Sequence, residues 1–174
     1  VSVGISSWRQ RSFNAIPPAV KSTASYMNSI LAKLEAKEHG YAEAIMLNEV
    51  GHVCEGTGEN LFIVRDGILM TPPLGDGLLE GITRDTVLNI AVDTDIPALE
   101  ETLNRSDLYV ADEMFMTGSA AELTPIGSVD NRVIGKPGPI TKALQERYFD
   151  VAYGKVPEYE AVSYTHLTLP TNSL

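Results

Sequence analysis

The sequence predicts an α+β fold with a barrel-like, mixed and largely antiparallel sheet and flanking helices. Three observations support this fold class. Short runs of β-forming residues are separated by Gly, Pro, Asp and Asn; three longer segments carry apolar residues at helical spacing; and the two kinds of segment do not alternate regularly. A regular βαβ alternation would have favoured a doubly wound parallel sheet, which we therefore do not expect.

The N-terminal part predicts one strand and one helix. Val1, Val3 and Ile5 alternate with small or polar residues, and two prolines follow at 17 and 18. Because proline is confined to sheet edges and loops, we expect residues 1–18 to form an edge strand followed by a loop. Apolar residues recur at helical spacing over residues 22–38, and Gly40 then predicts the end of a helix.

The next segment predicts antiparallel strands that follow one another along the chain. The dipeptide Asp66-Gly67 separates two apolar runs, which is a strong signal of a two-residue hairpin turn. The expected strands cover residues 44–47, 52–54, 60–65 and 68–70.

The remaining third predicts further helices and strands. We expect helices over 83–92 and 140–153, a short helical turn over 106–111 with Ser106 as its cap, a strand over 113–116, and a hairpin over 129–134 around Asp130-Asn131.

Composition excludes several classes of protein. The 174 residues carry a formal charge of −10, which disfavours a nucleic-acid partner because phosphate binding needs clustered Lys and Arg. A single cysteine, Cys54, gives neither a disulfide nor a zinc cluster, so no metal site is expected. No apolar stretch is long enough to cross a membrane, and no signal peptide is visible. We expect a cytoplasmic protein.

Two segments contain residues suited to catalysis. Lys21 follows Ile16-Pro17-Pro18 and precedes the first expected helix, although a lone lysine is usually a solvated surface charge. The segment 55–60, Glu-Gly-Thr-Gly-Glu-Asn, has two glycines in a strand-rich region, which indicates close backbone approach. On the pattern alone, a β-bulge with solvated carboxylates is the commoner explanation.

Two further segments are suited to binding anions. Gly81-Ile82-Thr83 begins an expected helix, where free N–H groups and the helix dipole favour a phosphate, although Thr83 could be an ordinary helix cap. The small residues 117–121 leave a strand and could form a second anion-binding turn or a purely structural one. An amine, a carboxylate and two such turns together are what pyridoxal 5'-phosphate (PLP) requires.

These motifs make the sequence similar to the branched-chain amino acid aminotransferases, which are class IV, fold type IV, PLP enzymes. The resemblance is carried by Ile16-Pro17-Pro18 with Lys21, by residues 55–62, by Gly81-Ile-Thr-Arg84, and by residues 111–122 with Thr124-Pro125. It runs in order from about residue 1 to about residue 160.

The resemblance implies roles for individual residues. Lys21 would be the catalytic lysine that forms the Schiff base and moves the α-proton, Glu55 would bind the pyridine nitrogen, and Tyr26 the phenolic oxygen of PLP. Glu59 and Arg84 are expected to pair. The other implied contacts are Leu79 beneath the ring, Ile82, Thr83 and Ser119 at the phosphate, and Ala120 and Ala121 at the substrate carboxylate.

The resemblance also implies a domain organisation and an activity. Residues 1–161 would be the large PLP-binding domain without the family's small N-terminal domain, and residues 162–174 depart from the family and are expected to be a disordered tail. The implied activity is transfer of the amino group of a branched-chain L-amino acid to 2-oxoglutarate, by a homodimer or larger assembly when full length. Alternatives are a D-amino acid aminotransferase, an aminodeoxychorismate lyase, a non-catalytic fragment, or an acidic interaction module with separated motifs.

Overall fold

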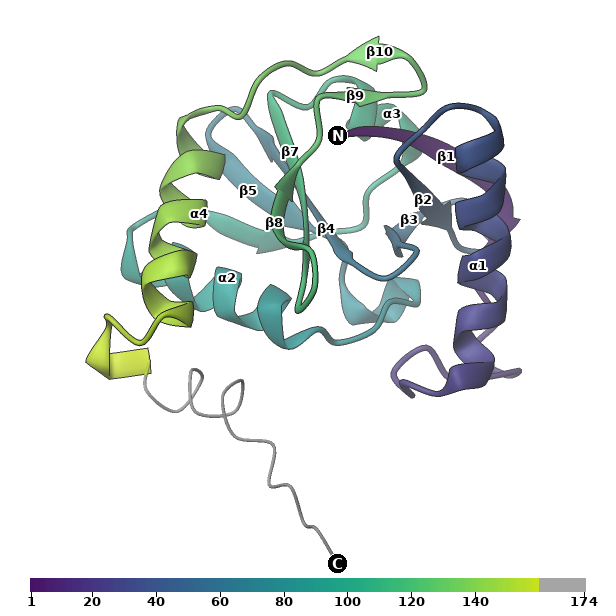
Figure 1. Cartoon of the computed structure of the whole chain (residues 1–174), viewed down its shortest axis with the longest axis horizontal. Coiled ribbons are helices and arrows are strands. Elements are labelled where there is room, and N and C mark those ends of the chain that lie inside the picture. The colour runs from purple at the N-terminus through teal and green to yellow at the C-terminus, as the bar shows by residue number, and fades with distance from the viewer. Residues whose placement is uncertain (160–174) are drawn as a thin grey trace, which may run out of the picture.

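The computed structural model describes residues 1–159 and confirms the predicted α+β fold class, with ten strands in one mixed sheet and four α-helices among these residues (Figure 1). The helices are α1 (Thr23–Glu38), α2 (Ile82–Asp93), α3 (Arg105–Tyr109) and α4 (Pro139–Ala152), and two 3₁₀ turns are η1 (Leu74–Asp76) and η2 (Pro157–Tyr159). The strands are β1 (Ser2–Arg9), β2 (Glu43–Leu47), β3 (Val53–Gly56), β4 (Asn60–Arg65), β5 (Ile68–Thr71), β6 (Ala98–Glu100), β7 (Glu113–Gly118), β8 (Glu122–Pro125), β9 (Ser128–Val129) and β10 (Arg132–Val133).

The sheet is largely antiparallel and curls back on itself. One path of strands runs β10-β9-β1-β2-β3-β4-β5-β6, and β7 pairs with both β4 and β8. The chain leaving β8 closes the circuit, since Ile126 N–H donates to Met114 O (2.8 Å) on β7 and Gly127 N–H donates to Val1 O (2.8 Å) beside β1. The short β8–β9 connection therefore bonds both to β7 and to the residue before β1, and this joins the two parts of the sheet into a barrel-like curve.

The position of β1 differs from the prediction. Residues 1–18 were expected to contain an edge strand, but β1 lies between β2 and β9 and is parallel to both. The two prolines lie in the loop after β1, so they do not interrupt its hydrogen bonds. Alternation in a sequence shows that a strand has two faces, but it does not show which strands will pair with it.

Successive residues along each strand point to opposite faces of the curved sheet, so the apolar core forms two clusters, one enclosed by the sheet and one on its outer face. Leu61 and Ile63 of β4 pack inside, with Met114 and Met116 of β7. The residues between them point outward: Phe62 of β4 stacks on Phe115 of β7, with ring centroids 5.1 Å apart. That outer cluster contacts α2 and α4, whereas α1 packs separately on β2.

The local elements follow the sequence closely. The first, second and last predicted helices are confirmed as α1, α2 and α4, and both hairpins are present, with positive φ at Asp66, Asp130 and Asn131 as such turns require. The expected cap of α3 is wrong: the helix begins after Asn104, whose N–H donates to Asp107 Oδ2 (2.7 Å), and Ser106 lies inside the helix.

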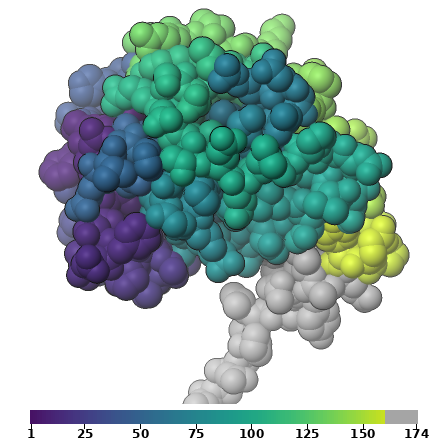
Figure 2. All heavy atoms as spheres, turned by 180° about the vertical axis from the view of Figure 1, so that it is seen from behind, coloured from purple at the N-terminus to yellow at the C-terminus, as the bar shows by residue number. Residues whose placement is uncertain are grey.

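The described part of the chain contains no helix long and apolar enough to span a bilayer. Seen from behind, the middle of the chain forms most of the visible surface, with the N-terminal segment at one side and the end of the described chain at the other (Figure 2). The predicted disordered tail, residues 162–174, lies outside the described residues.

Candidate functional site

A cavity of about 340 Å³ lies where four loops or turns meet. Its walls come from the loop before α1, the β3–β4 hairpin, the segment leading into α2, and the end of β7 with the turn toward β8. In Figure 1 the loop before α1, the start of α2 and the β7–β8 turn lie at the same, lower side of the molecule. The volume is within the range of small-molecule sites.

The cavity gathers most of the residues singled out from the sequence. The seven that line it are Lys21, Tyr26, Glu55, Leu79, Ile82, Thr83 and Ser119. Ala120 and Ala121 are in the β7–β8 turn beside Ser119 but are not among the lining residues. This arrangement is the opposite of the separated motifs that the interaction-module alternative requires.

Lys21 occupies a tight turn directly before α1. Val20 N–H donates to Pro17 O (3.0 Å) and Ser22 N–H donates to Val20 O (2.9 Å), while Ser25 Oγ from the first turn of α1 also donates to Val20 O (3.2 Å). The lysine side chain is exposed, and Tyr26, one helical turn further on, is also open to solvent. The backbone of the turn is thus fixed while the amine stays accessible from the cavity.

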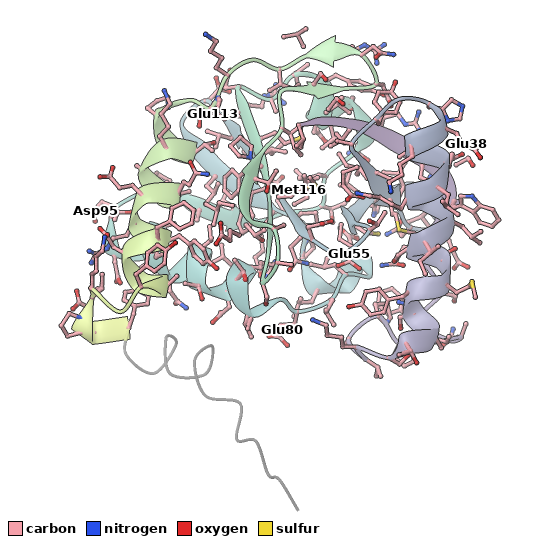
Figure 3. All side chains as sticks on the ribbon, in the orientation of Figure 1. Glu38, Glu55, Glu80, Asp95, Glu113 and Met116 are labelled. Atoms are coloured by element: carbon pink, nitrogen blue, oxygen red, sulfur yellow. The ribbon has the colours of Figure 1, made fainter. Side chains whose placement is uncertain are left out.

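Glu55 is partly buried at the wall of the cavity and accepts hydrogen bonds from three donors. Gln10 Nε2 donates to Oε1 (2.6 Å), and Leu79 N–H (3.0 Å) and Asn60 Nδ2 (3.3 Å) donate to Oε2. Figure 3 shows Glu55 of β3 between α1 and the β7–β8 hairpin, and Glu80, the neighbour of Leu79, at the lower edge of the molecule. Desolvation raises the pKa of Glu55 to about 7, partly offset by the Leu79 hydrogen bond and the nearby positive charge of Arg11.

Two cavity-lining threonines have buried hydroxyls. Among residues 1–159, Thr117 Oγ1 has no hydrogen-bond partner, and Thr83 Oγ1 has none in good geometry, although it lies near the hydroxyl of Tyr148; both threonines line the cavity. Gly81, not Thr83, is the N-cap of α2, so the ordinary helix-cap explanation of Thr83 is wrong. Since an unpaired buried hydroxyl is unfavourable, these two groups indicate a polar ligand that would accept or donate there.

Sequence reasoning assigned no role to two cavity-lining residues, Arg11 and Asn60, or to Gln10, which contacts Glu55 without lining the cavity, and it paired Glu59 with the wrong residue. Gln10 and Asn60 bind Glu55, and Arg11 lines the cavity with its guanidinium Nη1 bonded to Ser25 Oγ (2.7 Å). The only signal of their role was proximity to the motifs, because Gln, Arg and Asn are common in loops. The expected pairing of Glu59 with Arg84 is wrong.

Both members of that pair have other partners. Arg84 is buried and pairs with Glu100 of β6, and it also donates to Pro72 O (3.1 Å). Glu59 accepts from Gly58 N–H (3.0 Å). Burial and the neighbouring charge of Glu43 raise the pKa of Glu59, which favours the uncharged form of this carboxyl.

The family model described as amino-transferase class IV matches residues 1–129, which include every residue of the cavity. The chain belongs to the class IV aminotransferases. The residues of the cavity also fit the cofactor that the resemblance implied, because they offer an accessible amine, a carboxyl group, and the buried hydroxyls of Thr83 and Thr117.

Curated class IV relatives share about half of this chain's residues. A probable branched-chain-amino-acid aminotransferase of Aquifex aeolicus is 48% identical over 159 residues, which cover 90% of this chain and 51% of the relative. The branched-chain-amino-acid aminotransferase of Escherichia coli K12 is 44% identical over 156 residues, covering 88% of this chain and 50% of the relative. The chain therefore spans about half the length of the curated relatives it matches.

Solved class IV structures have the same fold. The branched-chain aminotransferase of Thermoproteus uzoniensis with norvaline superposes with a TM-score of 0.90 at 52% identity, over 92% of this chain and 54% of that chain. The T.th. branched-chain amino acid aminotransferase complexed with N-(5'-phosphopyridoxyl)-L-glutamate gives 0.89 at 45% identity, over 92% and 55%.

Proposed function

We propose that this chain is the cofactor-carrying part of a branched-chain aminotransferase, which transfers the amino group of leucine, isoleucine or valine to 2-oxoglutarate. The observation that carries the proposal is the single cavity lined by Lys21, Glu55, Thr83 and Ser119. Its relatives named as branched-chain aminotransferases support the substrate class, and a relative bound to a phosphopyridoxyl-glutamate adduct supports both the cofactor and the acidic amino-group partner.

PLP, when bound, supplies an aldehyde for attachment of amines and a ring that accepts an electron pair from the substrate carbon. In this proposal Lys21 Nζ is the general base that takes the α-proton and the general acid that returns it. Its exposed amine beside the cavity can reach a substrate without a change in the backbone turn that holds it.

Glu55 would hold a proton between its carboxylate and the pyridine nitrogen. Desolvation raises its pKa to about 7 in the ligand-free chain, and the positive charge of a protonated ring would lower that pKa again, so the ionised carboxylate and the protonated ring would stabilise each other. The Tyr26 hydroxyl would donate to the phenolic oxygen, and Leu79 would pack beneath the ring. These contacts would orient the ring against Lys21.

The phosphate would lie against the start of α2. Free N–H groups at Ile82 and Thr83, with the hydroxyls of Thr83 and Ser119, provide donors and a favourable dipole. The β7–β8 turn with Ala120 and Ala121 would present N–H groups to the substrate carboxylate. We further propose a homodimer or larger assembly in a cytoplasmic, reducing compartment, in which the buried and unpaired Cys54 would stay reduced.

Cofactor binding is tested by adding PLP to the chain and recording visible absorbance. We expect a new band that Lys21→Ala removes and that Lys37→Ala, an exposed lysine at the end of α1, leaves intact. A band that persists in Lys21→Ala would refute the role of this lysine.

Substrate class is tested on the loaded chain with L-leucine, D-alanine and aminodeoxychorismate. Loss of the band with L-leucine and its recovery with 2-oxoglutarate support the proposal. Reaction with D-alanine alone would support the D-amino acid aminotransferase, and pyruvate release from aminodeoxychorismate would support the lyase. A Lys21-dependent band with no turnover of any substrate would support the non-catalytic fragment.

A further inference from the structure

Asn60 lies where three parts of the cavity meet. It is the first residue of β4 and only 5% exposed. Its backbone pairs with Glu55 across the β3–β4 hairpin and with Thr117 on β7. Asn60 is thus next to both Glu55 and Thr117, two residues that line the cavity.

The side chain of Asn60 completes a ring of three hydrogen bonds. Its Nδ2 donates to Glu55 Oε2 (3.3 Å) and to Leu79 O (2.8 Å), while Leu79 N–H donates to the same Glu55 oxygen (3.0 Å). Leu79 is therefore bound through both its N–H and its C=O. The position of its peptide groups is tied to that of the carboxylate.

The other end of the amide fits closely against the start of α2. A Cβ built on Gly81 would overlap Asn60 Oδ1, so glycine is required there for the amide to lie where it does. Asn60 consequently touches the segment from Leu79 to Gly81, which leads directly into Ile82 and Thr83.

We propose that Asn60 is a positioning residue that fixes the Glu55 carboxylate and the Leu79–Thr83 turn relative to each other, so that the ring nitrogen and the phosphate of PLP are recognised together. This inference rests on the proposed function, since it concerns how that cofactor would be bound. Asn60 acts through Glu55 and the turn and does not itself supply a group for proton transfer.

The proposal makes a prediction for the chain without cofactor. The groups that face Glu55 are Gln10, Leu79 N–H and Asn60 as donors, Arg11 as a positive charge and Glu59 as a negative one. Asn60→Ala removes one donor from the ionised form, so the titration of Glu55 should move to higher pH. Asn60→Asp keeps the shape of the side chain but places a carboxylate oxygen against Glu55 Oε2 and Leu79 O. It should therefore raise the pKa of Glu55 more than Asn60→Ala does.

The ligand-free test uses the 174-residue chain and two readouts. Carbon-13 NMR of the Glu55 carboxyl follows its titration, and amide hydrogen exchange follows residues 79–83. We expect both Asn60 variants to shift the titration upward and to speed exchange in the turn about tenfold. Asn89→Ala is the matched control, because Asn89 is on α2, away from the cavity, and its side chain bonds to Asp85.

The cofactor test compares PLP with pyridoxal, which lacks the phosphate. In Asn60→Ala the Kd for PLP should rise about tenfold, and the ratio of the pyridoxal Kd to the PLP Kd should fall because the phosphate no longer meets donors in a fixed position. Three results would each overturn the proposal. They are a Glu55 pKa in the Asn60 variants equal to that of the unmodified chain, amide hydrogen exchange that becomes faster in α4 by the same factor as in residues 79–83, and an unchanged ratio of the two Kd values. If the parental chain binds no PLP, the proposed function fails, while the ligand-free readouts still decide the role of Asn60.

Discussion

Replacing Glu55 with glutamine should make the ligand-free chain more stable at alkaline pH. The pKa of this carboxyl is raised by desolvation from 4.5 to about 7. Below the lower value the group is protonated in both folded and unfolded chains, so no charge is buried. As the pH rises through 7 the folded chain must carry a charge at the cavity wall, and the stability that protonation gave is lost.

The size of the effect follows from the shift. One pKa unit corresponds to about 1.4 kcal/mol, and since the open cavity admits water we expect about 2 kcal/mol rather than the full value. Glutamine carries no charge at any pH and can still bond Gln10 if that amide rotates. The difference in unfolding free energy between Glu55→Gln and the parent should therefore grow by about 2 kcal/mol between about pH 5 and pH 8.5.

Urea denaturation of both proteins at the two pH values measures this difference, and titrating groups that do not interact with Glu55 cancel in the comparison. A difference that stays constant with pH would refute the reasoning, because it would mean that Glu55 ionises in the folded chain as readily as in the unfolded one. The same variant should lose PLP binding if the proposed function is correct.

Two further predictions concern buried polar groups. Glu113 accepts from Ile140 N–H (3.2 Å) and Thr141 N–H (2.7 Å) at the start of α4, so Glu113→Ala should lower the unfolding free energy by about 2 kcal/mol in a denaturant titration, whereas the exposed Glu38→Ala should change it little. Thr83→Val should change the ligand-free stability little but weaken PLP binding, because the hydroxyl makes no hydrogen bond of good geometry in the described residues and only lies near Tyr148; Thr86→Val should destabilise, because Thr86 Oγ1 donates to Ile82 O (2.9 Å). Equal destabilisation by both threonine variants would contradict the assignment.

Local sequence predicted what depends on neighbouring residues. Asp66-Gly67 and Asp130-Asn131 are at the hairpin turns, since their backbones accept positive φ, and the spacing of apolar residues located α1, α2 and α4. The central position of β1 and the pairing of Arg84 with Glu100 were not predictable in this way. Both depend on which distant segments meet, and no local pattern records that.

In the candidate site, too, some residues were predictable from local sequence and others were not. Lys21, Glu55 and the two turns stand out because they lie in recognisable motifs that occur together, whereas Gln10 and Asn60 are ordinary polar residues whose contacts with Glu55 become visible only in three dimensions. Supporting residues of this kind are hard to find from sequence, because many side chains could supply one amide donor.

The distribution of unsatisfied groups argues that the cavity is a site rather than a packing defect. Elsewhere in the described chain, unpartnered buried polar atoms belong to Asp76, Arg84 and Thr141, and the charged groups of Asp76 and Arg84 have ion-pair partners through their other atoms. Three of the six buried polar atoms without a partner among residues 1–159 belong to cavity residues, namely Arg11, Thr83 and Thr117. Glu55, with its raised pKa, lies in the same cavity. Because each of these groups costs folding free energy, their gathering around one cavity is what a chain would show if a polar, anionic ligand satisfied them on binding.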